Sequence, residues 1–256
     1  MKRIFYLLAL LVWAIQGYAQ TIDRHYNQLN SGVRGYEGFD QMAKEYFIRA
    51  TSNMDKKYYR EAIDDFSRAI EFEPRYAEAY NNRGIAKRNV EDRNGAIDDF
   101  TLAIDIDPKY AEAFNNRGNA KLDLTDYAGA VDDYTNAINL DPRHAETYNN
   151  RGLARNSLHD TVGAIDDFTR AIAINHRFAD AYNNRGLAKN DLQDYSGAID
   201  DFTRAIKIVP GFAMAYSNRG VVKMKTGQKD SGCLDLSKAI ELGNSQAYEA
   251  SKKFCK

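Results

Sequence analysis

The chain has 256 residues, of which 35 are basic, 36 are acidic and 44% are apolar, so its formal net charge is −1. This balance argues against a nucleic-acid-binding protein and against a protein of anionic membrane surfaces, because both need an excess of lysine and arginine. With four histidines and two cysteines, the sequence offers little material for a metal site. We therefore expect no metal ion, no other cofactor and no nucleic-acid partner.

Residues 1–19 are typical of a secretory signal peptide. A basic start at Lys2 and Arg3 precedes an apolar run over residues 4–15, and small residues lead to a candidate cleavage point after Ala19. The run is short for a membrane span, so we expect no stable membrane insertion after cleavage; the alternative is a retained N-terminal anchor. No asparagine of the sequence stands in an Asn-X-Ser/Thr acceptor site, which favours a bacterial host. We expect an exported protein of the bacterial envelope, in the periplasm or secreted.

After a glycine-containing segment, an eight-residue motif recurs every 34 residues along most of the chain. Its first full copy, Ala77–Gly84, is Ala-Glu-Ala-Tyr-Asn-Asn-Arg-Gly, and later copies begin at residues 111, 145, 179 and 213. A second motif, Gly95–Ile104, returns with the same period, and a proline such as Pro108 follows it. Apolar residues within each motif return at three- and four-residue steps, which predicts one buried face of an α-helix. One such helix pair buries too little surface to be stable alone, so neighbouring pairs must stack.

These motifs resemble the tetratricopeptide-repeat (TPR) family. The 34-residue period matches, as do the aromatic and the glycine of the first motif (Tyr80 and Gly84) and the small and aromatic residues of the second (Ala96 and Phe100). The resemblance implies an all-α fold, a right-handed superhelical solenoid of antiparallel helix pairs. We expect a flexible lead-in at 20–42, six TPR repeats at 43–76, 77–110, 111–144, 145–178, 179–212 and 213–244, and a capping helix at 245–256.

The family resemblance implies a protein–protein interaction scaffold that binds an extended peptide or a partner protein in the concave groove of the solenoid. We do not expect an enzyme, because no repeat carries its own cluster of histidine, acidic or serine residues that breaks the pattern. Two alternatives stay open. One is a self-associating structural module, and the other is a binding protein of the envelope that handles cell wall or carbohydrate.

Paired amides in the first helix of each repeat are the candidate peptide-binding residues. In TPR proteins these places line the groove, and an asparagine amide offers both a donor and an acceptor to a peptide backbone. The alternative is that the amides join neighbouring first helices to each other. The groove candidates are Asn81, Asn82, Asn115, Asn116, Asn149, Asn150, Asn183, Asn184 and Asn218.

The chain departs from the family where its first helices carry basic residues at places that are usually apolar or aromatic. The second helices carry paired acidic residues, and one member of each pair can face the basic column. We interpret the two columns as a structural ion-pair ladder, which sets register more than it adds stability; a basic groove that binds anions is the alternative. The ladder comprises Arg83, Arg117, Arg151, Arg185 and Arg219 with Asp99, Asp133, Asp167 and Asp201.

Two cysteines near the C-terminus are placed to form a disulfide. Cys233 precedes a predicted turn at Asn244 by eleven residues, and Cys255 follows it by eleven, so an antiparallel helix pair brings them to the same height. An exported chain meets oxidising conditions, and we therefore predict a Cys233–Cys255 disulfide that fastens the capping helix. The alternative is two buried free thiols.

Overall fold

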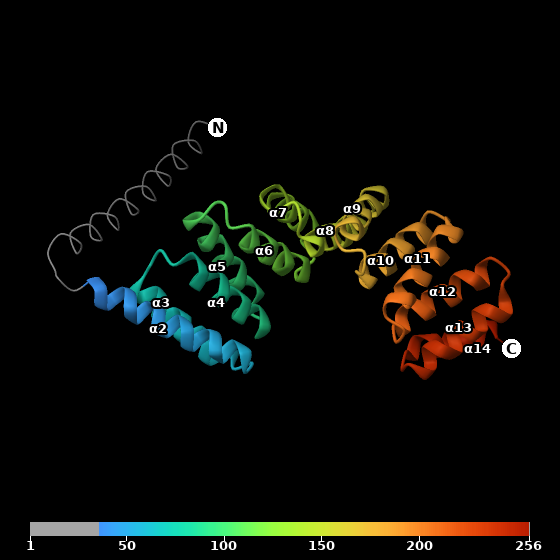
Figure 1. Ribbon diagram of the computed structural model, residues 1–256, viewed down its shortest axis with the longest axis horizontal. Coiled ribbons are helices and arrows are strands. Elements are labelled where there is room, and N and C mark those ends of the chain that lie inside the picture. The colour runs from blue at the N-terminus through green and yellow to red at the C-terminus, as the bar shows by residue number, and fades with distance from the viewer. Residues whose placement is uncertain (1–35, 256) are drawn as a thin grey trace, which may run out of the picture. The chain divides into compact units, whose positions relative to one another are not determined.

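The computed structural model describes residues 36–255, and every regular element in that range is an α-helix (Figure 1). The predicted all-α fold of helix pairs is therefore confirmed for this part of the chain. The expected signal segment at 1–19 lies outside the described residues, as does the lead-in before residue 36. The helices are α2 (Tyr36–Asp55), α3 (Tyr59–Phe72), α4 (Ala77–Asn89), α5 (Arg93–Ile106), α6 (Ala111–Asp123), α7 (Tyr127–Leu140), α8 (Ala145–Ser157), α9 (Thr161–Ile174), α10 (Ala179–Asp191), α11 (Tyr195–Ile208), α12 (Ala213–Lys225), α13 (Lys229–Glu241) and α14 (Ser245–Phe254).

The chain divides into two compact units at the boundary between Tyr76 and Ala77. In the first unit, α2 packs along α3. The ring of Phe47 stacks on Tyr76, with centroids 4.8 Å apart, and meets Phe66 edge-on at 5.5 Å. Phe66 is fully buried and Phe47 and Tyr76 are half-buried, so the aromatic packing extends from the interior of this unit toward its surface.

Helix α2 starts earlier than the sequence indicated. Residues 36–42 form its first seven residues, although we expected them in the flexible lead-in. One turn into the helix, Asp40 Oδ2 lies 2.6 Å from Lys44 Nζ, an i,i+4 ion pair that favours helix over coil. The one glycine of these seven residues, Gly38, therefore does not prevent helix formation.

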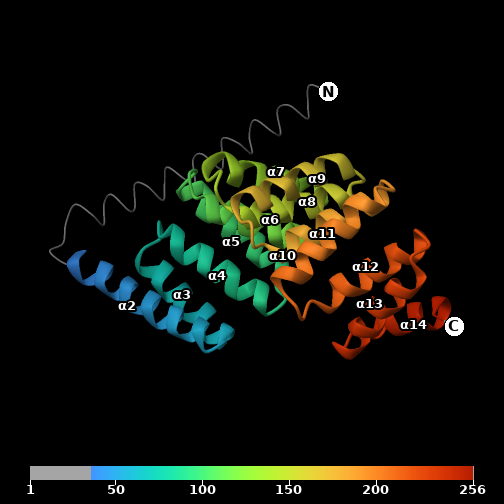
Figure 2. The same cartoon turned by 45° about the vertical axis from the view of Figure 1, so that its right-hand side comes forward.

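The second unit contains α4–α14, and both views show its helix pairs following one another (Figure 2). Each helix packs against the next along the chain, and the first helices α4, α6, α8, α10 and α12 also contact one another in that order. These first helices begin at the first residue of the expected repeats. Helix α14, in the place of the expected capping helix, packs against α13 and α12.

A recurring turn joins the two helices of each central pair. Asp92 Oδ1 accepts a hydrogen bond from the backbone nitrogen of Gly95 at 3.0 Å and so caps α5. The residue before this aspartate adopts the left-handed conformation that ends many helices, with φ between 62° and 69° in the four central pairs. The same cap is made by Asp126, Asp160 and Asp194.

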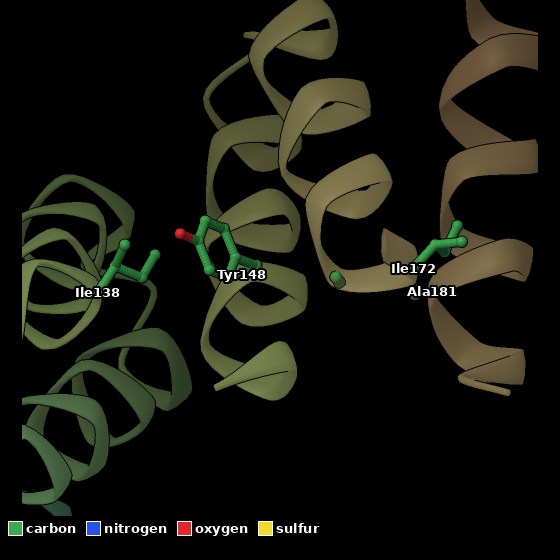
Figure 3. Packing of buried hydrophobic residues seen from close by; sticks show 5 residues of the cluster. Ile138, Tyr148, Ile172 and Ala181 are labelled. Carbon is green, nitrogen blue, oxygen red and sulfur yellow. The ribbon is translucent and has the colours of Figure 1, made fainter. Parts of the chain in front are cut away.

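Glycines and rings fix how closely the two helices of a pair approach. A Cβ atom added to Gly84 would lie 2.7 Å from Cε1 of the Phe100 ring, so no larger residue fits there. Gly118 with Tyr134, Gly152 with Phe168 and Gly186 with Phe202 repeat this contact. Between pairs, apolar residues from four successive helices form the core, as Ile138, Tyr148, Ile172 and Ala181 show (Figure 3).

Candidate functional site

The arginine of each first helix grips an aspartate of the following second helix with two hydrogen bonds. In α4 and α5, Arg83 Nη2 lies 2.7 Å from Asp99 Oδ1 and Arg83 Nε lies 2.9 Å from Asp99 Oδ2. Lys87 Nζ approaches the same carboxylate at 2.9 Å, and Asp99 is only 2% exposed. The two cationic partners of this buried carboxylate replace the hydrogen bonds that water would make to it.

The same arrangement recurs through the second unit and joins the sequence-predicted ladder residues in pairs. The pairs are Arg83–Asp99, Arg117–Asp133, Arg151–Asp167, Arg185–Asp201 and Arg219–Asp235. Sequence reasoning missed Asp235, although its 34-residue distance from Asp201 was a usable signal. In the first unit, Arg49 pairs with Asp65 in the same way.

The ladder arginines also connect consecutive repeats. Arg151 Nη1 donates to Thr135 Oγ1 at 3.0 Å, which belongs to the second helix of the preceding repeat. Its guanidinium also lies 5.7 Å from the centroid of the Tyr148 ring. Because these groups are engaged inside the repeats, the geometry favours the structural interpretation of the ladder over a basic anion-binding groove. The matching bonds are Arg117–Thr101, Arg185–Thr169 and Arg219–Thr203.

The paired amides join neighbouring first helices to each other. Asn116 Nδ2 donates to Asn81 Oδ1 at 3.0 Å, and Asn184 Nδ2 donates to Asn149 Oδ1 at the same distance. Asn218 continues the series toward Asn183 at 2.9 Å.

The first asparagine of each of these pairs, which accepts the hydrogen bond, is therefore not available to a ligand. Asn81, Asn149 and Asn183 are buried, with exposed fractions of 0%, 6% and 3%. Our interpretation of these three residues as groove-facing is corrected for this reason: they bind the next helix. The second amides are half-buried and lie at the edge of the accessible surface; they are Asn82, Asn116, Asn150, Asn184 and Asn218.

The amide series is interrupted between α6 and α8. Here Asn150 Nδ2 donates to Asn119 Oδ1 at 3.1 Å, because the oxygen of Asn115 accepts instead from Thr147 Oγ1 at 3.0 Å. Asn119 also accepts from the hydroxyl of Tyr134 at 2.8 Å. The polar contacts at this junction thus differ from those of its neighbours.

A hollow of about 500 Å³ lies at the same junction. Its lining includes Tyr110, Glu112, Asn115, His144, Glu146 and Thr147. Burial raises the pKa of the Tyr110 phenol, and the neighbouring carboxylates of Glu112 and Glu78 raise it further. The carboxylates therefore give this ring negatively charged surroundings.

An exposed row of side chains follows the first helices. The second and ninth residues of a first helix lie two turns apart on one stripe, and this stripe, which we call the first-helix face, carries acidic and apolar groups. Leu153 and Leu187 are 36% and 37% exposed. The exposed acidic members of the face are Glu78, Glu112, Glu146 and Asp180.

The two cysteines of the predicted disulfide lie close together. Cys233 Sγ on α13 and Cys255 Sγ at the end of α14 are 2.08 Å apart, which is a disulfide distance, and the bond itself stays a prediction. Cys233 is half-buried. Within residues 36–255 no group of three metal-ligating side chains comes together, and no helix is long and apolar enough to cross a membrane.

Stacked helix pairs whose first helices align their exposed side chains on one face define an α-helical repeat protein of the interaction-scaffold class. Tetratricopeptide-repeat models match residues 77–110 and 179–212, and a TPR repeat model matches residues 118–157. The chain belongs to the tetratricopeptide-repeat family.

Solved structures agree with this assignment. The crystal structure of MamA is 30% identical, with a TM-score of 0.60 over 64% of this chain and 96% of that one. YrrB, described as a TPR protein with an unusual peptide-binding site, is 23% identical, with a TM-score of 0.61 over 73% and 97%. PilF of Pseudomonas aeruginosa is 16% identical, with a TM-score of 0.74 over 84% and 99%. The likeness to YrrB and PilF is one of fold, and no curated protein matches the sequence.

Proposed function

We propose that the chain is a scaffold whose first-helix face binds an extended peptide segment of a partner protein. The observation that carries this proposal is that the side chains of the first helices fall into two groups, one that binds neighbouring helices and one that is exposed. Their buried amides and ladder arginines bind neighbouring helices, while Glu112, Glu146, Asp180, Leu153 and Leu187 stay exposed on the same stripe. Such a face offers carboxylates to donors of a peptide and apolar surface to its side chains.

The second amides of the pairs contribute from the edge of this face. Asn116, Asn184 and Asn218 donate one amide hydrogen to the preceding helix, which leaves the carbonyl oxygen free of that bond. A half-buried amide oxygen can accept from a peptide backbone nitrogen. The peptide site that we propose therefore differs from the one expected from the sequence. It consists of the second amides of the pairs together with the exposed acidic and leucine residues, and it omits the buried first amides.

Site-specific photo-crosslinking tests the proposal. A benzophenone amino acid replaces Leu187 on the first-helix face, and a matched variant carries it at exposed Arg170 on the second helix α9. We expect irradiation of cells that express the chain to link position 187, but not 170, to one defined peptide segment, which mass spectrometry maps. Equal labelling at both positions contradicts the proposal, and links only to a second copy of this chain support the self-association alternative instead.

We also propose that the chain works in an oxidising compartment of the bacterial envelope. The cysteine pair at disulfide distance supports this location, together with the sequence of residues 1–19. A fusion of the full chain to a phosphatase that is active only outside the cytoplasm tests it, because export predicts activity and retention predicts none.

A further inference from the structure

The hollow between α6 and α8 lies where four repeat positions change together. His144 stands where Tyr110, Phe178 and Phe212 stand in other repeats. Thr147 replaces an alanine, Asn119 replaces an isoleucine, leucine or valine, and Tyr134 replaces a phenylalanine or leucine. All four changes are on α6, α7, α8 and the turn before α8, so a single junction departs from the repeat in concert.

Two of the four exchanged residues, His144 and Thr147, line the hollow, and their contact orients the His144 ring. Tyr110 and Phe178 pack against the apolar clusters of their own junctions, whereas the smaller ring of His144 is exposed. Thr147 has one hydroxyl hydrogen, which it donates to Asn115 Oδ1 at 3.0 Å, so the contact of 2.7 Å between Thr147 Oγ1 and His144 Nδ1 needs a hydrogen on Nδ1. In a neutral ring Nε2 then carries the lone pair and is an acceptor.

The sign of the electrostatic potential in the hollow follows from the charges around it. Glu112, Asp141 and Glu146 contribute to its lining. Helices α6 and α8 also begin there, and a helix N-terminus carries about half a positive charge, so the carboxylates exceed the two N-termini by about two negative charges. An anionic ligand is thus disfavoured, and a cationic one is attracted.

We propose that this hollow receives a lysine or arginine side chain of the bound peptide. Its volume of about 500 Å³ falls in the range of about 300–1,000 Å³ that is common for ligand pockets. The acceptors Glu112, Glu146 and His144 Nε2 match the several N–H donors of an ammonium or guanidinium group. The inference rests on the proposed peptide-binding function and assigns to this junction the selection of a cationic residue.

Titration of the ¹⁵N-labelled full chain by NMR tests the inference. The probes are three blocked pentapeptides, Ac-Ala-Ala-Xaa-Ala-Ala-NH₂, in which Xaa is Arg, Ala or Glu. We expect the Arg peptide to shift the backbone resonances of Asn115, His144 and Thr147, and the Ala and Glu peptides to leave them unchanged. No shift with the Arg peptide, or equal shifts with all three, overturns the inference.

Matched variants locate the charge requirement. E112Q/E146Q should weaken binding of the Arg peptide by about tenfold, because both carboxylates at the hollow lose their charge. The control D98N/D166N removes two exposed carboxylates from the second helices α5 and α9, away from the first-helix face, and should change the affinity less than about twofold. Equal weakening in both variants would show a general effect of net charge and overturn the assignment to this hollow.

A third variant, H144F/T147A, restores the repeat pattern at the junction. Since Phe178 and Ala181 occupy these places in the next repeat, we expect it to fold with an unchanged circular dichroism spectrum and to lose the Arg-peptide shifts. Retained shifts overturn the inference. The photo-crosslink from position 187 separates the two proposals: if it persists while the Arg peptide fails to bind, only the inference about the hollow is wrong.

Discussion

Replacing Arg151 with methionine should destabilise the fold strongly. In the folded chain, Arg151 supplies contacts of 2.7 and 3.0 Å to the Asp167 carboxylate, and Arg155 supplies a third of 2.9 Å. Asp167 is 3% exposed, so the R151M variant keeps a buried charge that has lost two of these bonds. Removing one partner of a buried ion pair costs about 3–5 kcal/mol, and we expect about 3 kcal/mol because Arg155 stays.

Urea unfolding followed by circular dichroism measures this loss, with a thermal scan beside it. For a unit of this size a loss of about 3 kcal/mol lowers Tm by about 6–12 °C. The control R170M alters an exposed arginine of α9 and should change stability by less than about 0.5 kcal/mol. The triple variant R151M/R155M/D167L removes all three charges and should recover much of the loss, because apolar side chains can replace a buried ionic group at little net cost.

One result would refute this account of the ladder. If R151M unfolds within about 0.5 kcal/mol of the unmodified chain and yet loses the photo-crosslinked peptide, the arginine column is a ligand site. The anion-binding groove, which was the alternative interpretation of the sequence, would then be the better description.

Three further predictions concern single positions. Thr125 adopts φ 62°, which costs a β-branched residue about 1–2 kcal/mol. T125G removes this cost but adds chain entropy to the unfolded state, so the free energy of unfolding should rise by about 0.5–1 kcal/mol and the urea midpoint should increase. A lower midpoint would contradict this prediction. Burial raises the pKa of the Tyr134 phenol, so above the ordinary tyrosine value of about 10 the unfolded chain releases a proton that the folded chain keeps, and stability falls with rising pH. Y134F should make that alkaline loss shallower, and an unchanged slope would contradict the burial argument. Cys233 and Cys255 should give no free thiol in denatured, non-reduced protein, and reduction should destabilise the chain by about 3 kcal/mol for a loop of this separation; two free thiols would contradict the disulfide.

The 34-residue period predicted most of the architecture because each repeat must satisfy the same packing. Gly84 and Phe100 occupy facing places, and the structure brings them into the close contact that a small residue beside an aromatic ring predicts. The Arg83–Asp99 pair follows for the same reason, since the two columns recur together. Local helix geometry and repetition were sufficient for these features.

What the period could not predict depends on contacts between repeats or on single departures. Asn81 and Asn82 are adjacent in sequence, and only the rotation of the next helix decides that the amide of Asn81 is buried against Asn116. His144 and Thr147 depart from the repeat at neighbouring places in the sequence, and the hollow that they line is defined only when α6 and α8 are placed together. Reasoning from an averaged repeat discards such departures, although a functional site resides in them.

Hydrogen–deuterium exchange with the crosslinked peptide tests the central claim most directly. The peptide identified from position 187 is synthesised, added in excess to the full chain, and the exchange of each helix is compared with that of the free chain. A peptide on the first-helix face predicts slower exchange in α6, α8 and α10, with α7, α9 and α11 unchanged. Slower exchange confined to the second helices would contradict the claim that the first helices form the binding face.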